Sequence, residues 1–142
     1  MAAASDQGQR DRLPDRWAQR LGWAIAGLTA CVLLASAGGK LARTGATLAE
    51  LGRLGYDADN AVRIGVAQIT GAVLYLIPAT GVLGAILITA YMGGGVAAHL
   101  IAGDPVGVPV LTAGATWLGL ILRDPDVRRV VPWKRRHANA AW

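Results

Sequence analysis

The sequence predicts an all-α membrane protein, a four-helix transmembrane bundle with a short amphipathic segment between helices 1 and 2. The first observation behind this prediction is the stretch 64–102, which contains no Lys, Arg, Asp or Glu and is broken once, by Pro-Ala-Thr-Gly at 78–81. A helix needs about 20 apolar residues to cross a bilayer core, so this stretch is long enough for two spans joined by a turn. The second observation is composition: 54% of the residues are hydrophobic and 16% are charged, whereas soluble domains carry about 25% charged residues.

Four apolar runs account for the four predicted spans. The first is expected at 21–39, where two glycines and then Lys40 end the run. The second is expected at 61–77 and the third at 82–102, on either side of the Pro-Ala-Thr-Gly turn. The fourth is expected at 106–122, after a Gly-Asp-Pro sequence that interrupts helical structure.

The segment 40–62 differs from the spans because charged residues lie between its apolar ones. Leu41, Leu48, Leu51 and Leu54 recur at helix-like spacing in it. This pattern predicts a short amphipathic helix that lies at the membrane interface or over the bundle.

The terminal segments complete the domain organisation. Residues 1–16 are polar and of mixed charge and are expected to be disordered; the transmembrane domain is assigned to 17–132 and a basic tail to 133–142. Of the 14 Lys and Arg residues, ten fall on the side of the termini and four on the side of the amphipathic segment. Basic residues are enriched on the cytoplasmic side of membranes, so both termini are predicted to be cytoplasmic. The net charge of +5 follows from this topology, and no nucleic-acid-binding motif accompanies it.

Cys31 is the only cysteine, which excludes an intramolecular disulfide and a thiolate metal site. We interpret it as a small hydrophobic residue buried inside the first helix. The sequences at 28–31 and 35–37 also resemble a lipoprotein cleavage box and a signal-peptidase site. Because the apolar run continues past Cys31, a retained helix is the preferred interpretation.

A few polar side chains within the apolar stretch form a candidate ligand pocket. Gln68 and Tyr75 are seven residues apart and therefore share one face of the second helix. In an antiparallel hairpin, Tyr91 returns to the depth of Gln68, and His99 comes near the outer surface. Polar groups in membrane spans face the bundle interior, so these four side chains are expected to converge between the second and third helices. The alternative is that Gln68 only bonds a neighbouring helix and Tyr75 only packs with its hydroxyl satisfied.

Lys40 and Asp104 are expected beside His99 at the outer mouth of this pocket. Lys40 either anchors the first helix among the headgroups or pairs with an acidic side chain or an anionic ligand. His99 either exchanges a proton with a ligand or only bonds Asp104 or water at the interface. No residue is assigned a catalytic role, and no metal site is predicted, because no carboxylate pair accompanies His99 on its helix.

Several short sequences occur in a familiar order: Ser-Ala-Gly-Gly-Lys-Leu at 36–41, Ile-Gly-Val-Ala-Gln at 64–68, Tyr-Leu-Ile-Pro at 75–78 and Leu-Ile-Leu-Arg-Asp-Pro at 120–125. Together they resemble the DoxX-like family, over most of the chain. That family consists of small bacterial four-helix membrane proteins, so the resemblance implies a multi-pass protein of the bacterial cytoplasmic (inner) membrane. Position 68 is commonly Glu in the family, and Gln68 cannot carry a charge or a transferable proton.

Three functions are compatible with these observations. The preferred one is a non-catalytic accessory or structural subunit of a membrane complex, because the spans contain few titratable groups. The second follows from the resemblance, since some relatives associate with thiosulfate:quinone oxidoreduction or with redox-stress complexes: a redox membrane protein with a quinone as cofactor and redox-complex proteins as partners. The third is a small transporter component. Besides such proteins, the expected partner is the lipid bilayer, and nucleic acid is not expected.

Overall fold

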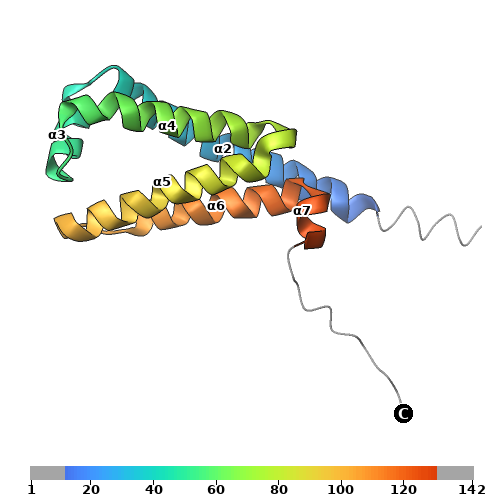
Figure 1. The fold of residues 1–142 in the computed structure, drawn as a ribbon. Helices are drawn as coiled ribbons and strands as arrows, with labels where there is room; N and C mark the ends of the chain where they lie inside the picture. The colour runs from blue at the N-terminus through green and yellow to red at the C-terminus, as the bar shows by residue number, and fades with distance from the viewer. Residues whose placement is uncertain (1–11, 131–142) are drawn as a thin grey trace, which may run out of the picture.

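The computed structural model describes residues 12–130, and this part of the chain is helical throughout, with no strands. The fold consists mainly of four long helices, with one short α-helix at each end of the arrangement that they form (Figure 1). In chain order the elements are α2 (Arg12–Leu41), α3 (Gly45–Arg53), α4 (Ala58–Leu76), the 3-10 helix η1 (Pro78–Thr80), α5 (Gly81–Ala102), α6 (Gly107–Arg123) and α7 (Pro125–Val130).

The four long helices form two pairs. Helix α2 packs against α4, and α5 packs against α6; α4 also contacts α5, and α2 contacts α6, which closes the arrangement. The pairs converge near η1 and α7 and diverge toward the end that carries α3 (Figure 1). The short helix α3 therefore lies at the open end, next to α2 and α4.

Two of the helical segments, Arg16–Leu41 and Pro78–Ala102, are long and apolar enough to cross a membrane, and Gly107–Arg123 is a shorter apolar helix. Only 33% of the most apolar window of each long segment is buried inside the structure. Large apolar side chains such as Leu28, Leu83 and Leu111 are therefore at the surface. Soluble monomers rarely expose contiguous apolar patches on this scale, which is consistent with a membrane environment.

Helix α2 is longer than the predicted span. It begins at Arg12, inside the segment 1–16 that was expected to be disordered, and it continues through the two glycines to Leu41. In the turn that follows α2, Arg43 has a left-handed φ of 49°. Residues 1–11 and 131–142, which hold most of the two predicted terminal segments, lie outside the described residues.

The amphipathic segment is shorter than its leucine spacing suggested. Helix α3 covers only Gly45–Arg53, and Leu51 is its one buried residue. The chain then turns at Gly55, whose φ of 82° suits glycine. Asp57, in extended conformation, precedes α4, which begins at Ala58.

The Pro-Ala-Thr-Gly sequence forms the predicted turn between α4 and α5. Pro78 occupies the first position of η1, where its missing N–H costs nothing. The Thr80 hydroxyl donates a hydrogen bond to the Leu74 carbonyl at 2.9 Å, and the Ile77 N–H donates to the Val73 carbonyl at 3.3 Å. These bonds satisfy carbonyls at the end of α4 that have no partner within the helix.

Glycines bring the two helix pairs into close contact at the end near η1. A Cβ on Gly84 of α5 would collide with the backbone of Tyr75 in α4, and a Cβ on Gly22 of α2 would collide with the backbone of Arg123 in α6. Such contacts between backbones hold membrane helices together.

At the α3 end, the glycine contacts are within each pair. Gly65 of α4 lies against Ala37 of α2, where a Cβ would come to 3.3 Å from the carbonyl oxygen. A Cβ on Gly95 of α5 would lie 3.6 Å from the Cβ of Pro109 in α6. The pairs are thus free to diverge here, which leaves room for a cavity between them.

Cys31 lies within α2, as expected, but the interpretation of it as a buried residue is wrong. Its side chain is exposed, next to the exposed Val32 and one turn from Leu28. The buried face of α2 is formed by Ala26, Ala30, Leu33 and Ala37. An apolar sequence around a residue indicates that its helix avoids water. It does not indicate which face of that helix contacts other helices.

Candidate functional site

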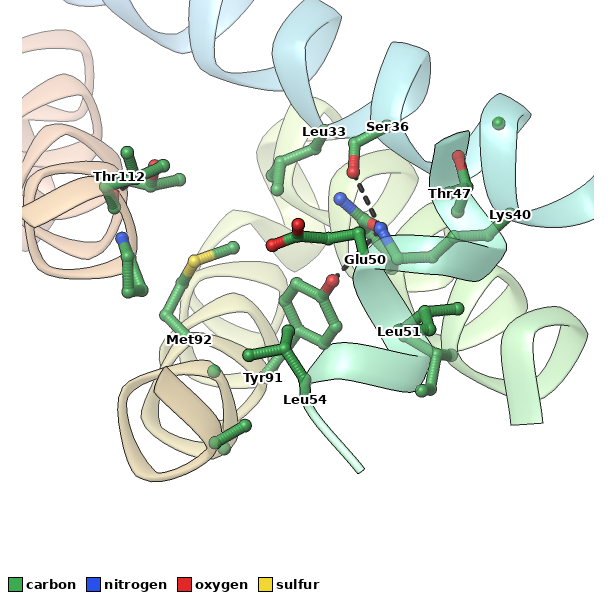
Figure 2. Close-up of a pocket in the computed structure, with 18 of the residues that line it drawn as sticks. Leu33, Ser36, Lys40, Thr47, Glu50, Leu51, Leu54, Tyr91, Met92 and Thr112 are labelled. Atoms are coloured by element: carbon green, nitrogen blue, oxygen red, sulfur yellow. Dashed lines mark hydrogen bonds between the residues drawn. The ribbon is translucent and has the colours of Figure 1, made fainter. Parts of the chain in front are cut away.

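A cavity of about 620 Å³ occupies the divergent end of the structure. It is bounded by all four long helices and by α3. Most of its wall is apolar, and the larger aliphatic side chains that line it are Val32, Leu33, Leu51, Leu54, Ile64, Met92 and Val108. Figure 2 shows Leu33 and Met92 on the left of this space and Leu51 of α3 on the right.

A buried polar network lies against this apolar space. The Lys40 ammonium donates hydrogen bonds to Ser36 Oγ at 2.7 Å and to Gln68 Oε1 at 3.1 Å. The Tyr91 hydroxyl donates to the same Gln68 oxygen at 3.2 Å. Lys40 is 9% exposed and Gln68 is 3% exposed. The network therefore joins α2, α4 and α5 at one point of the cavity wall.

Local sequence places each of these groups. Ser36 and Lys40 are four residues apart, so they lie on the same face of α2, one turn from each other. Lys40 also occupies the last turn of α2, where the negative end of the helix dipole favours a cation. Gln68 and Tyr91 meet because α4 and α5 are antiparallel on either side of η1.

The rim of the cavity carries an ion-pair cluster. Arg53 of α3 pairs with Glu50, at 3.0 Å to both carboxylate oxygens, and with Asp104 in the loop after α5. The hydrogen bond to Asp104 is the largest of the effects that raise the pKa of Arg53. These bonds connect α3 to the opposite helix pair across the mouth.

His99 completes the rim. Its Nδ1 lies 3.7 Å from an Asp104 carboxylate oxygen, which is too long for a hydrogen bond. The same nitrogen is buried and has no hydrogen-bond partner among the residues that the structure describes. His99 is thus positioned at the mouth with one ring nitrogen free.

The structure brings four of the six sequence-predicted residues to one cavity. Lys40, Gln68, Tyr91 and His99 all line it, and Asp104 lies at its rim through Arg53. Whether these residues bind a ligand stays a prediction.

Tyr75 does not line this cavity. Its hydroxyl donates to the Thr116 carbonyl at 2.8 Å, and it is fully buried. Tyr75 shares the inward face of α4 with Gln68, but seven residues of helix separate them by about 10 Å along the axis. The shared face was predicted correctly, and the shared pocket was not.

Sequence reasoning missed a second buried polar cluster, around Arg123. Arg123 follows the apolar run 106–122 directly, where a basic residue ordinarily faces the headgroups, yet it is only 5% exposed. Its guanidinium lies over the rings of Trp23, at 4.6 Å, and Tyr75, at 4.4 Å, and it donates to the Tyr75 carbonyl. Gly81 leaves space for the guanidinium, and Gly22 leaves space for the backbone of Arg123; these small residues were the available signal.

Comparison with known proteins bears on the whole of this arrangement. The model of the DoxX-like family matches residues 24–122, which include α4 and α5, most of α2 and α6, and all the residues of the polar network. Neither the comparison with curated proteins nor the comparison with solved structures found a match. Since the family match covers more than half of the chain, the protein belongs to the DoxX-like family.

Proposed function

We propose that this protein is a multi-pass protein of the bacterial cytoplasmic membrane that holds an amphipathic small molecule in the cavity beneath α3. In this proposal α2, α4, α5 and α6 all cross the bilayer as a four-helix bundle, and both termini are cytoplasmic. The observation that carries the proposal is the buried network of Lys40, Gln68 and Tyr91 beside an apolar space of about 620 Å³.

The size and lining of the cavity support a ligand. Small-molecule sites are about 300–1,000 Å³ in volume and are mostly apolar, with a few polar groups that orient the ligand. Polar side chains inside a membrane are costly and mark functional positions more often than their soluble counterparts. A cavity with Lys40 and Gln68 on one wall and Leu33 and Met92 on another fits a polar head joined to a hydrocarbon chain.

A quinone is one ligand of this class, because its carbonyl oxygens would accept hydrogen bonds from the Lys40 ammonium. In that case the residues of this chain bind and orient the head group, and the redox chemistry belongs to the quinone. This role suits an accessory subunit that holds a ligand for a membrane complex without catalysing a reaction itself.

Reporter fusions test the topology. Fusions at Ala3, Asp57 and Ala138 should report cytoplasmic, external and cytoplasmic locations, because ten of the 14 basic residues lie on the side of the termini. A reporter that is active only in the cytoplasm and one active only outside it should give opposite patterns. A cytoplasmic signal at Asp57 with external termini would reverse the proposed orientation.

Ligand titration tests the cavity. Decylbenzoquinone should bind the purified protein in a non-ionic detergent. Gln68→Leu should raise its dissociation constant about tenfold, because the oxygen that accepts hydrogen bonds from both Lys40 and Tyr91 is lost. Isothermal titration calorimetry measures the change. Thr70→Val is the matched control: Thr70 is on the exposed face of α4, and its hydroxyl bonds only to the Val66 carbonyl. Equal binding by the wild type and Gln68→Leu would contradict the proposed site.

A further inference from the structure

The charge on Lys40 has no counter-ion in the cavity wall. Its two hydrogen-bond acceptors, Ser36 Oγ and Gln68 Oε1, are neutral. Among residues 12–130, no carboxylate oxygen lies within salt-bridge distance of its ammonium. A buried ammonium is unfavourable unless an anion pairs with it, and the negative end of the α2 dipole offsets only part of that cost.

The carboxylates nearest the cavity are already paired. Both oxygens of Glu50 accept hydrogen bonds from Arg53, and Asp104 pairs with the same guanidinium. Figure 2 shows the Glu50 carboxylate directed away from the Lys40 ammonium in that view. The ion pairs at the rim therefore leave Lys40, deeper in the wall, without a partner of opposite charge.

Although Glu50 and several hydroxyl groups also line the cavity, the part of the polar wall around Lys40 and Gln68 offers mainly hydrogen-bond donors. A Lys ammonium cannot accept a hydrogen bond, so the Gln68 side chain must turn its oxygen toward Lys40. That oxygen then receives both Lys40 and Tyr91, and the amide N–H groups of Gln68 have no protein acceptor in the described part of the chain. The third N–H of Lys40 likewise has no acceptor among residues 12–130.

We propose that the cavity selects an anionic amphiphile, whose carboxylate or phosphate head binds the Lys40 ammonium and the Gln68 amide while its hydrocarbon chain lies along Leu33 and Met92. This inference rests on the proposed function, namely that the cavity holds an amphipathic ligand. It adds the charge of the head group, which distinguishes a fatty acid or an alkyl phosphate from a neutral alcohol or quinone.

The test compares ligands that share a ten-carbon chain and differ in the head. Decanoate and decyl phosphate should bind the purified protein in non-ionic detergent at least tenfold more tightly than decanol, because charge-assisted hydrogen bonds are about twice as strong as neutral ones. Acetate and inorganic phosphate should show no binding at the same concentrations, because they lack the chain. Isothermal titration calorimetry gives all five affinities.

Variants of Lys40 identify the group responsible. Lys40→Met should bring the ratio of decanol to decanoate dissociation constants to about one, and Lys40→Arg should preserve the preference for decanoate. Arg63→Met removes the same charge from an exposed position of α4 and should leave the ratio unchanged. If Arg63→Met lowers the ratio as much as Lys40→Met does, the preference arises from overall charge and the inference is wrong.

Gln68→Glu provides a second variant that does not remove the buried cation. It places a carboxylate where an oxygen now lies 3.1 Å from the Lys40 nitrogen, so Lys40 gains an internal counter-ion. Decanoate binding should fall by tenfold or more, and decanol binding should persist. Retention of tight decanoate binding by this variant would overturn the inference even if Lys40→Met does not fold.

The outcomes separate the inference from the proposed function. If decanol, decylbenzoquinone and decanoate bind the wild type equally well, the cavity is a ligand site without preference for anions, and only the inference fails. If none of them binds, the proposed function fails as well. If acetate binds as tightly as decanoate, the site takes free small anions, and the amphiphile is excluded.

Discussion

Replacing Gly84 by alanine is expected to lower the free energy of unfolding by about 2 kcal/mol, because the new methyl group collides with the backbone of a neighbouring helix. The Cβ would meet the backbone nitrogen and Cα of Tyr75 and the carbonyl carbon of Leu74. No side-chain rotation can relieve contact with backbone atoms, so α4 and α5 must move apart. Thermal unfolding in detergent, followed by circular dichroism, measures the loss as a lower midpoint.

Gly93→Ala is the matched control on the same helix. Nothing lies within 4 Å of a Cβ built at Gly93. In a helix interior, alanine is favoured over glycine by about 1 kcal/mol, so this variant should be as stable as the wild type or slightly more stable. Equal destabilisation by the two substitutions would show that α4 and α5 do not approach each other as described.

Removing the Arg123 side chain should have the largest effect among the single polar substitutions. Arg123→Met is expected to cost about 2–4 kcal/mol, because it removes a charged hydrogen bond to the Tyr75 carbonyl and two cation–π contacts. The Tyr75 carbonyl lies in the last turn of α4, where it has no partner within the helix. Without the Arg123 guanidinium, this buried carbonyl has no hydrogen-bond donor in the described part of the chain.

Two further variants separate geometry from charge. Arg123→Lys keeps the charge but has no planar group to lie between two rings, so its stability should fall between those of the wild type and Arg123→Met. Arg20→Met removes a charge from an exposed position of α2 at the same end of the molecule and should leave the unfolding midpoint unchanged. A stable Arg123→Met would mean that the guanidinium is not buried between Trp23 and Tyr75.

The helices and their order could be predicted because the signals for them are local. Apolar runs separated by Gly-Asp-Pro and Pro-Ala-Thr-Gly define four long helices, and η1 forms at the predicted turn. The contact between Gln68 and Tyr91 could also be predicted, since an antiparallel hairpin with a short turn fixes which residues share a depth. Helix ends were less accurate, because glycines near Lys40 are tolerated within α2.

Which face of each helix packs inward could not be read from hydrophobicity. In a membrane protein the lipid-facing and protein-facing surfaces are both apolar, so Cys31 and Ala30 look alike in sequence although one is exposed and the other buried. The better signal was side-chain size, since small residues at a spacing of three or four mark the packed face. Ala26 and Ala30 are four residues apart on α2, and Ala37 lies on the same face two turns beyond Ala30.

The pairing of Arg53 with Asp104 and the burial of Arg123 required the three-dimensional structure for a different reason. Arg53 meets Asp104 across 51 residues of sequence, and Arg123 meets Tyr75 across 48. No local pattern encodes such pairs. In the sequence, Arg53 and Arg123 are only charged residues outside the apolar runs. The ordinary expectation for such residues is a position that faces solvent or headgroups.

The glycine contacts that join the two helix pairs through main-chain atoms are found at the η1 end of the molecule. The spacing between the pairs is therefore fixed more firmly at that end than at the α3 end. Where Gly22 and Gly84 bring backbones together, the distance between the helix pairs is set by main-chain atoms and cannot change without breaking those contacts. At the other end, the pairs are joined by side chains alone, through Gln68 and Tyr91 and through Arg53 and Asp104. If the cavity holds a ligand as proposed, we therefore expect ligands of different width to be accommodated at the α3 end, where main-chain contacts between the pairs do not fix the spacing.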